Sequence, residues 1–116
     1  MAPERPPLPV LFYRTRTGNE PVRGWLKELP PIERARIGAD LYRVQSEWPV
    51  GLPLCRSLGG GLWEIRSSLP SNRIARLMFF IEDDEIYVVH GFIKKTQKTP
   101  PEEIELARRR FKETKT

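Results

Sequence analysis

Three apolar, strand-like runs joined by very short connections are the feature that most constrains how this sequence can fold. The runs cover residues 62–69, 73–81 and 86–93, and the connections fall at residues 70–72 and 83–84. The proline, serine, asparagine and aspartate residues in these connections favour tight turns. Strands joined by such short turns run antiparallel, so the sequence predicts an antiparallel meander.

Helical patterns lie on both sides of this meander in the sequence. Residues 20–29 and 32–48 form two of them, and the two prolines between them can start the second helix but cannot continue the first. A third helix is expected after Thr99, where Thr-Pro-Pro-Glu is typical of a capping box with proline at the first helical position. With a short strand at residues 10–13, the order is β-α-α-β-β-β-α. The expected fold is therefore α+β, a small antiparallel sheet with the helices packed on one face.

Length and composition favour one small domain inside the cell. The chain has 116 residues, of which residues 1–9 include four prolines and are interpreted as an N-terminal tail, leaving residues 10–116 as a single domain. No apolar run approaches the roughly 20 residues that span a bilayer, so we expect a cytoplasmic protein without membrane contact. Cys55 is the only cysteine, which excludes an internal disulfide and a cysteine-rich metal site and predicts a buried or loop thiol.

Positive charge gathers at the end of the third strand-like run. The chain has a formal net charge of +5, which favours a polyanionic partner. The stretch HGFIKKTQKTP, residues 90–100, begins like a buried strand and then places Lys94, Lys95 and Lys98 within five positions. Such a cluster either binds phosphate groups or only keeps the edge of a sheet soluble.

Alternation along the strands assigns side chains to the two faces of the sheet. With turns at the expected places, Arg66 lies opposite Arg76, and Arg76 lies opposite Gly91. The solvent-side arginine face is expected to carry Glu64, Arg66, Ser68, Arg76, Met78, Phe80, Tyr87, Val89 and Gly91. The face beneath the helices is expected to carry Trp63, Ile65, Leu77, Phe79, Val88, His90 and Phe92. Glycine opposite Arg76 would leave open space for a ligand's backbone, but a one-residue slip in register would reverse the assignment.

Two arginines that face each other across neighbouring strands repel, so this arrangement calls for an explanation. Two arginines and three lysines suit a phosphate backbone better than a small neutral substrate. Alternatively, Glu64 pairs with one of the arginines, and the lysines only keep the sheet edge soluble.

Several segments together resemble a known family. They are GLWEIR at residues 61–66, Arg76 before LMFF, and HGFIKKTQKTP leading into EEIELARRR, and the likeness extends over residues 22–110. The sequence is similar to the HigB-like, phage-related branch of the RelE toxin superfamily. The resemblance implies a RelE-like toxin of a type II toxin–antitoxin pair, which cleaves mRNA on the translating ribosome without a metal or another cofactor. It also implies inhibition by a helix-turn-helix antitoxin encoded in the same operon.

The resemblance also suggests roles for individual residues. Arg76 matches the phosphate-contacting arginine of the superfamily, and Arg66 lies one strand across from it. We expect catalytic roles for Arg66, Arg76 and Lys95, and RNA binding by Arg73, Lys94 and Lys98. Lys95 is preferred for catalysis because the expected register places it on the arginine face, whereas Lys94 falls on the other side.

Two departures from the better-known members leave the general acid and base unassigned. Glu64 stands where RelE has a lysine, and the last helix lacks the catalytic tyrosine of RelE. Glu64 either orients Arg66, serves as the base, or is a surface charge. His90, the only histidine, is interpreted as a structural residue directed toward the helices rather than a catalytic one.

Two rival functions fit the same sequence. ParE-like members of the superfamily keep the fold, lack the RNase residues and poison DNA gyrase. The retained arginines and lysines argue against that function, whereas the missing tyrosine favours it. The other rival is a non-catalytic, basic, phage-derived protein that binds RNA. The run ARRR at residues 107–110 fits either RNA binding or a solvated helix face.

Overall fold

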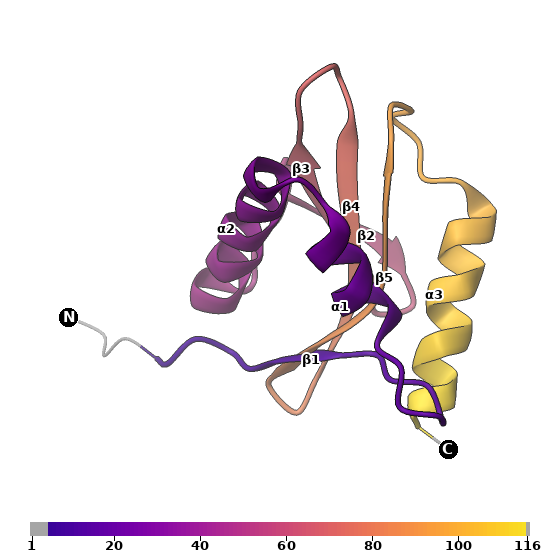
Figure 1. The fold of residues 1–116 in the computed structure, drawn as a ribbon. Helices are drawn as coiled ribbons and strands as arrows, with labels where there is room; N and C mark the ends of the chain where they lie inside the picture. Colours follow the sequence, from indigo (N-terminus) through magenta and orange to yellow (C-terminus); the bar gives the residue numbers. More distant parts are fainter. Residues whose placement is uncertain (1–4, 116) are drawn as a thin grey trace.

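The computed structural model describes residues 5–115 and confirms the α+β class. Within this range the elements are β1 (Val10–Phe12), α1 (Pro21–Glu28), α2 (Pro31–Glu47), β2 (Cys55–Gly59), β3 (Leu62–Ser68), β4 (Ile74–Glu82), β5 (Glu85–Lys94) and α3 (Pro101–Thr114). The strands form one sheet in the order β1-β5-β4-β3-β2 (Figure 1). β1 runs parallel to β5, and the other neighbouring pairs are antiparallel. No helix within residues 5–115 is long and apolar enough to cross a membrane.

The predicted meander forms β3, β4 and β5. Ser71 and Asn72 at the first turn have φ values of 65° and 57°, and Asp83 and Asp84 at the second have φ values of 52° and 59°. Asparagine and aspartate tolerate this left-handed conformation better than most residues, which explains why the chain reverses at these points. Both predicted turns and the antiparallel pairing are confirmed.

One strand, β2, differs from the sequence prediction and lies at an edge of the sheet. It pairs antiparallel with β3, with Cys55 opposite Ile65 and a register shift between Ser57 and Gly59. The proline and glycine residues around it predict a loop, and the strand arises from its pairing with β3 rather than from a pattern of its own. Cys55 is buried as predicted, and burial raises the pKa of its thiol to about 12.

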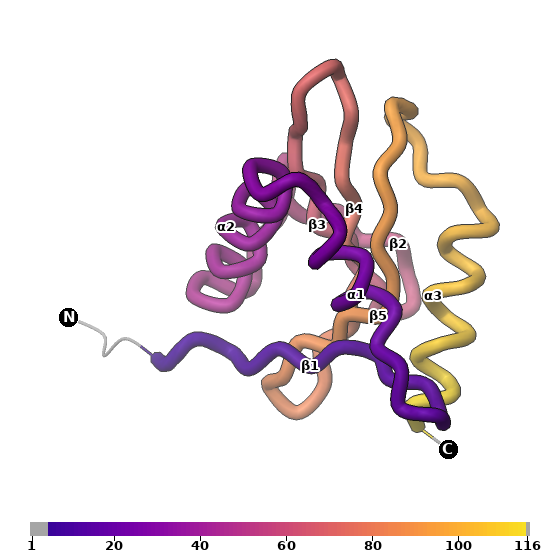
Figure 2. The backbone as a smooth tube through the Cα atoms, viewed as in Figure 1, coloured from indigo at the N-terminus to yellow at the C-terminus, as the bar shows by residue number. Residues whose placement is uncertain are grey.

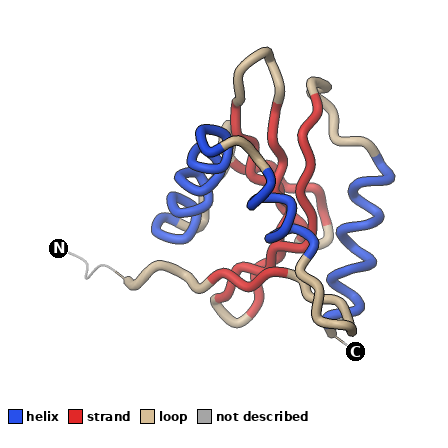
Figure 3. The backbone as a smooth tube through the Cα atoms, viewed as in Figure 1, coloured by secondary structure: helices blue, strands red, loops and turns tan. Residues whose placement is uncertain are grey.

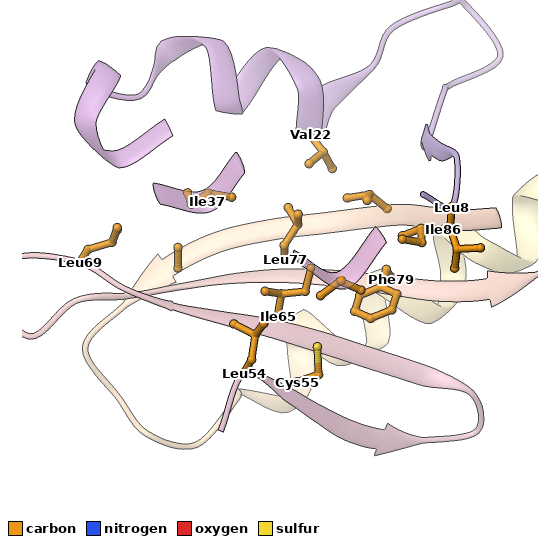
Figure 4. Packing of buried hydrophobic residues seen from close by; sticks show 13 residues of the cluster. Leu8, Val22, Ile37, Leu54, Cys55, Ile65, Leu69, Leu77, Phe79 and Ile86 are labelled. Atoms are coloured by element: carbon orange, nitrogen blue, oxygen red, sulfur yellow. The ribbon is translucent and has the colours of Figure 1, made fainter. Parts of the chain in front are cut away.

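The helices cover both faces of the sheet. α1 and α2 pack on the face that carries Ile65, Leu77 and Phe79 (Figures 1 and 4). α3 packs on the opposite face, where the ring of Phe111 stacks on that of Phe80 with their centroids 3.8 Å apart. The prediction that all helices share one face is therefore wrong, because the narrow apolar stripe of α3 covers a second apolar patch on the sheet.

Part of the predicted N-terminal tail packs on the domain. Leu8 is only 6% exposed, its backbone N–H donates to the Gln45 carbonyl at 2.9 Å, and the Gln45 side chain donates to the Leu8 carbonyl at 2.8 Å. The chain therefore contacts α2 before it enters β1 (Figure 2). The first four residues of the predicted tail lie outside the described residues.

Candidate functional site

A β-bulge in β5 changes which residues share a face. Near the second turn, Phe79 pairs with Val88, as the predicted register requires. Beyond the bulge, Met78 pairs with His90 and Arg76 pairs with Phe92, so Val89 is an extra residue without a partner on β4. The predicted pairing of Arg76 with Gly91 is wrong by this one residue.

The shift turns several side chains to the face opposite the predicted one. His90 and Phe92 lie on the Arg76 side of the sheet, with their rings stacked at a centroid distance of 5.5 Å. Gly91 instead faces α1, where a Cβ atom would lie only 2.5 Å from Cζ3 of Trp25. The prediction that His90 shares a face with Ile65 and Leu77 is therefore wrong, although His90 does lie against a helix, α3. The prediction that Gly91 leaves room for a ligand is also wrong.

Lys94 also lies on the arginine face, contrary to prediction. Its ammonium nitrogen is 5.6 Å from the centroid of the Phe92 ring, and Phe92 is the strand partner of Arg76. The sequence favours Lys95 over Lys94 for catalysis because a β5 without a bulge would place only Lys95 on the arginine face. The bulge removes this reason.

Arg76 is buried completely. Its Nη2 donates to the carbonyl of Thr96, its Nη1 lies 3.5 Å from the carbonyl of Lys94, and its guanidinium lies 5.7 Å from the centroid of Phe92. Nε has no hydrogen-bond partner, although Oε2 of Glu64 is 3.8 Å away. Burial lowers the pKa of Arg76, the charge of Arg66 lowers it further, and Glu64 opposes both. The expectation of a solvent-side arginine is wrong at this position.

Glu64 is the counter-charge of this cluster and is itself buried completely. Its carboxylate accepts hydrogen bonds from Arg66 at 2.9 Å and from the Thr99 hydroxyl at 2.9 and 2.7 Å. Thr99 makes no capping hydrogen bond, and Pro100 occupies the N-cap position of α3. The predicted capping box is wrong because the Thr99 hydroxyl is used to hold Glu64 instead.

Arg66 lies opposite Arg76, as predicted, and reaches the surface. Its side chain is 13% exposed, and its Nη2 donates to the Gln97 carbonyl at 3.1 Å and to the Gln97 side-chain oxygen at 3.3 Å. Glu64 contacts both arginines, which offsets the repulsion expected from their cross-strand pairing. Of the three readings of Glu64, a surface charge is excluded by its burial.

A cleft of about 410 Å³ opens beside Arg66, lined by residues of the β3–β4 turn and of the segment that follows β5. Its lining residues are Pro53, Arg66, Ser68, Leu69, Asn72, Arg73, Ile74, Lys95 and Gln97. The structure thus brings together three of the predicted cationic residues, Arg66, Arg73 and Lys95. It leaves Arg76 beneath the surface and places Lys94 and Lys98 outside the cleft lining.

The side chain of Arg73 is restrained by two contacts. It forms an ion pair with Glu33 of α2, and its Nε donates to the Pro70 carbonyl at 3.3 Å. Lys95 and Lys98 are exposed. Sequence reasoning did not identify Gln97 and Thr99 as contacts of the charged residues, because no periodic pattern or known spacing marks either position.

A family model described as "Phage derived protein Gp49-like (DUF891)" matches residues 24–112. The chain belongs to this family. The Gp49-like family is toxin-like and of the RelE/HigB type. This agrees with the resemblance of the sequence to the RelE superfamily. No curated protein matches the chain.

In this Gp49-like chain, α3 is tied to the sheet by two of its three consecutive arginines. Arg108 donates to the carbonyls of Leu58 and Gly59 at 2.9 and 3.0 Å. Arg110 donates at 2.9 Å to the carbonyl of Val89, the bulged residue. Arg109 is exposed. The run is therefore neither a simple solvated face nor a free cationic cluster.

His90 lies at the inner surface of α3 rather than in the cleft. Its Nε2 is 3.3 Å from Oε2 of Glu103. Burial lowers the pKa of His90, and the hydrogen bond to Glu103 opposes this shift in part. Within residues 5–115, no group of three histidine, cysteine, aspartate or glutamate side chains is placed to hold a metal ion.

Proposed function

We propose that this Gp49-like protein is the toxin of a type II toxin–antitoxin pair, of the HigB-like branch, and that it cleaves mRNA on the ribosome in the cytoplasm. The observation that carries the proposal is the cationic cleft, in which Arg66 is held by the buried Glu64 beside Lys95 and Arg73. The net charge of +5 and membership of a toxin-like family support a polyanionic target.

The reaction needs few protein groups. The ribose 2′-hydroxyl attacks the adjacent phosphorus, the 5′-oxygen of the next nucleotide leaves, and negative charge grows on the phosphoryl oxygens. The enzyme must orient the phosphate, accept one proton, donate another and stabilise that charge. Arg66 is suited to stabilise the charge, because the buried Glu64 holds its guanidinium at the edge of the cleft. A preorganised cation of this kind does not have to be ordered during the reaction.

The remaining cations are assigned around this arginine. Lys95 lines the same cleft and is our candidate for proton transfer, while Arg73 lines the cleft from the β3–β4 turn. Lys94 and Lys98, outside the cleft lining, are proposed to bind the phosphates of flanking nucleotides or of ribosomal RNA. Glu64 is proposed to orient Arg66 rather than to act as the base, because it is buried beneath Thr99.

The test is expression of the protein alone, with growth, mRNA ends and DNA integrity followed together. We expect growth arrest and new mRNA ends inside translated reading frames. Arg66→Ala should lower the cleavage rate about a hundredfold or more, whereas the exposed Arg109→Ala is the matched control. DNA breaks with intact mRNA would identify a gyrase poison instead, and a folded Arg66→Ala variant of full toxicity would exclude the cleft as the active site.

The lysines separate binding from catalysis. Lys94→Gln and Lys98→Gln should weaken ribosome or RNA affinity, each lowering the slope of log affinity against log salt by about one unit. Lys95→Gln should in addition cut the cleavage rate at saturating ribosome. A wild-type rate for bound Lys95→Gln would remove Lys95 from the reaction.

A non-catalytic RNA-binding protein is the second candidate. It is favoured by the complete burial of Arg76 and by the absence of tyrosine from α3. Such a protein would bind RNA with the same salt dependence but would produce no new mRNA ends.

A small helix-turn-helix antitoxin encoded in the same operon is the proposed partner. It would neutralise the toxin by covering the cleft or the surface that meets the ribosome. Co-expression of the neighbouring gene should restore growth, and the two proteins should copurify. A gene without such a neighbour, or a neighbour that does not bind, would favour the non-catalytic function.

A further inference from the structure

The loop that links β5 to α3 is drawn in tan in Figure 3, and we call its residues 95–99 the strap. The strap contacts Glu64, Arg66 and Arg76, the charged residues of the buried cluster. The Thr96 carbonyl accepts from Arg76, and the Gln97 carbonyl accepts from Arg66. The Thr99 hydroxyl donates to Glu64. One short segment thus covers the buried cluster of Glu64, Arg66 and Arg76.

The strap contacts are of a kind that a phosphate group could replace. Main-chain carbonyls are neutral acceptors, whereas phosphate oxygens are charged and make shorter and stronger hydrogen bonds with guanidinium groups. Arg76 also keeps an unused donor, because its buried Nε has no hydrogen-bond partner. The guanidinium beneath the strap therefore has one donor, Nε, that the strap does not satisfy, and the nearest carboxylate oxygen, Oε2 of Glu64, lies 3.8 Å from it.

The strap contacts the cluster through the carbonyls of Thr96 and Gln97, the Gln97 side chain and the Thr99 hydroxyl, and of its residues only Thr99 is buried. Its first four residues, 95–98, are exposed, and Thr99 is the buried one, with 5% exposure. Segments with few buried contacts open locally at a small fraction of the free energy of global unfolding. Because Thr99 is the buried residue of the strap, its hydrogen bonds to Glu64 are the contact chosen to test how the strap is held closed.

We propose that the strap is an autoinhibitory cover over Arg76, latched by Thr99, which must open before a phosphodiester can reach this arginine. On opening, phosphate oxygens replace the carbonyls of Thr96 and Gln97, and Arg76 joins Arg66 in one anion site. That the anion is RNA rests on the proposed function. That the strap covers Arg76 does not depend on it.

The decisive variant is Thr99→Val, which keeps the shape of the side chain and removes the latch. Apparent affinity equals intrinsic affinity multiplied by the fraction of open molecules, so losing a hydrogen bond to a charged group should tighten polyanion binding about tenfold. Two probes would be titrated, inorganic pyrophosphate and a short fluorescein-labelled single-stranded RNA. Amide hydrogen exchange at residues 96–99 should become faster in the same variant.

Three further variants keep the test decisive. Thr99→Ser should restore wild-type affinity because it keeps the hydroxyl. Thr114→Val makes the same chemical change at the far end of α3, where the hydroxyl donates to the Arg110 carbonyl, and should leave polyanion affinity unchanged. Gln97→Gly loosens the strap without touching Glu64, and it serves if Thr99→Val does not fold.

The outcomes separate the strap from the proposed function. Faster exchange with unchanged or weaker binding of both probes would show that the strap is only structural and would overturn the inference. Unchanged exchange in both Thr99→Val and Gln97→Gly would overturn the latch. Tighter pyrophosphate binding without mRNA cleavage by any variant would support the strap and refute the RNase function.

Discussion

The two faces of the sheet are closed in different ways. The face beneath α1 and α2 is mostly apolar, with Ile65, Leu77 and Phe79 among its buried residues (Figure 4). Its buried Ser67 donates a hydrogen bond to Asp40 of α2 at 2.6 Å. The face beneath α3 is apolar only in part, and beside that patch it buries Glu64 and Arg76, each with no exposed surface. The same strands therefore carry a conventional core on one side and a desolvated charge cluster on the other.

The two faces of the sheet serve different purposes. Apolar burial stabilises a fold at roughly 25 cal/mol per Å². Burying an ion pair costs desolvation that the attraction only just offsets, so apolar residues of similar size are often as stable. We infer that the charged side is kept for its chemistry, and four substitutions test this division.

The largest effect is expected from Glu64→Gln. It removes the counter-charge shared by two arginines, one of them buried, and should cost about 4 kcal/mol of the free energy of unfolding. Urea denaturation measures this, with Glu105→Gln at an exposed position of α3 as the control. A loss below about 1 kcal/mol would mean that the cluster is solvated in solution, and the contrast between the faces would disappear.

Leu77→Ala probes the apolar face. Leu77 is 1% exposed, and its truncation should cost about 3 kcal/mol through lost burial and a residual cavity. The folded fraction should bind RNA with wild-type affinity, because the change lies on the side away from the cluster. Leu52→Ala, at a residue that is 70% exposed, is the matched control for stability. If Leu77→Ala bound RNA more weakly than wild type after correction for its unfolded fraction, the two faces would be coupled.

Arg110→Ala probes the tie between α3 and the bulge. The change leaves the carbonyl of the buried Val89 without this donor and should cost about 2 kcal/mol. The neighbouring Arg109→Ala removes the same charge from an exposed side chain and should stay within about 0.5 kcal/mol of wild type. Equal stability of the two variants would show that the bulge is held by packing alone.

The smallest effect is expected from His90, and it depends on pH. Burial lowers its pKa below the ordinary value of about 6.5, so the unfolded chain binds the proton more readily than the folded chain does. The contribution of His90 to the free energy of unfolding should be fully present above about pH 6.5 and should be lost as the pH falls below it. His90→Gln should flatten this part of the Tm–pH profile, and the difference between the two profiles isolates the histidine from the carboxylates. A wild-type profile that rises on acidification would contradict the assignment.

Local sequence determined a large part of the fold. Prolines set the helix boundaries, and asparagine and aspartate closed the two turns, because these preferences act over a few residues. The pairing of Arg66 with Arg76 followed from the first turn alone. The lysines at the end of β5 and just beyond it form a cluster in HGFIKKTQKTP, and Lys95 lines the cleft with Arg66.

Tertiary structure decided which of these residues are accessible. One extra residue, Val89, shifts the rest of β5 by one position, and nothing in the local pattern marks it, because a bulge depends on what packs on each side. On one side Trp25 fills the space that only Gly91 leaves free, and on the other Arg110 holds the bulge carbonyl. The sequence alone thus determined that arginines and lysines gather at this end of the sheet. Only the packing of distant segments determined that Arg76 is buried, with the strap closed over it.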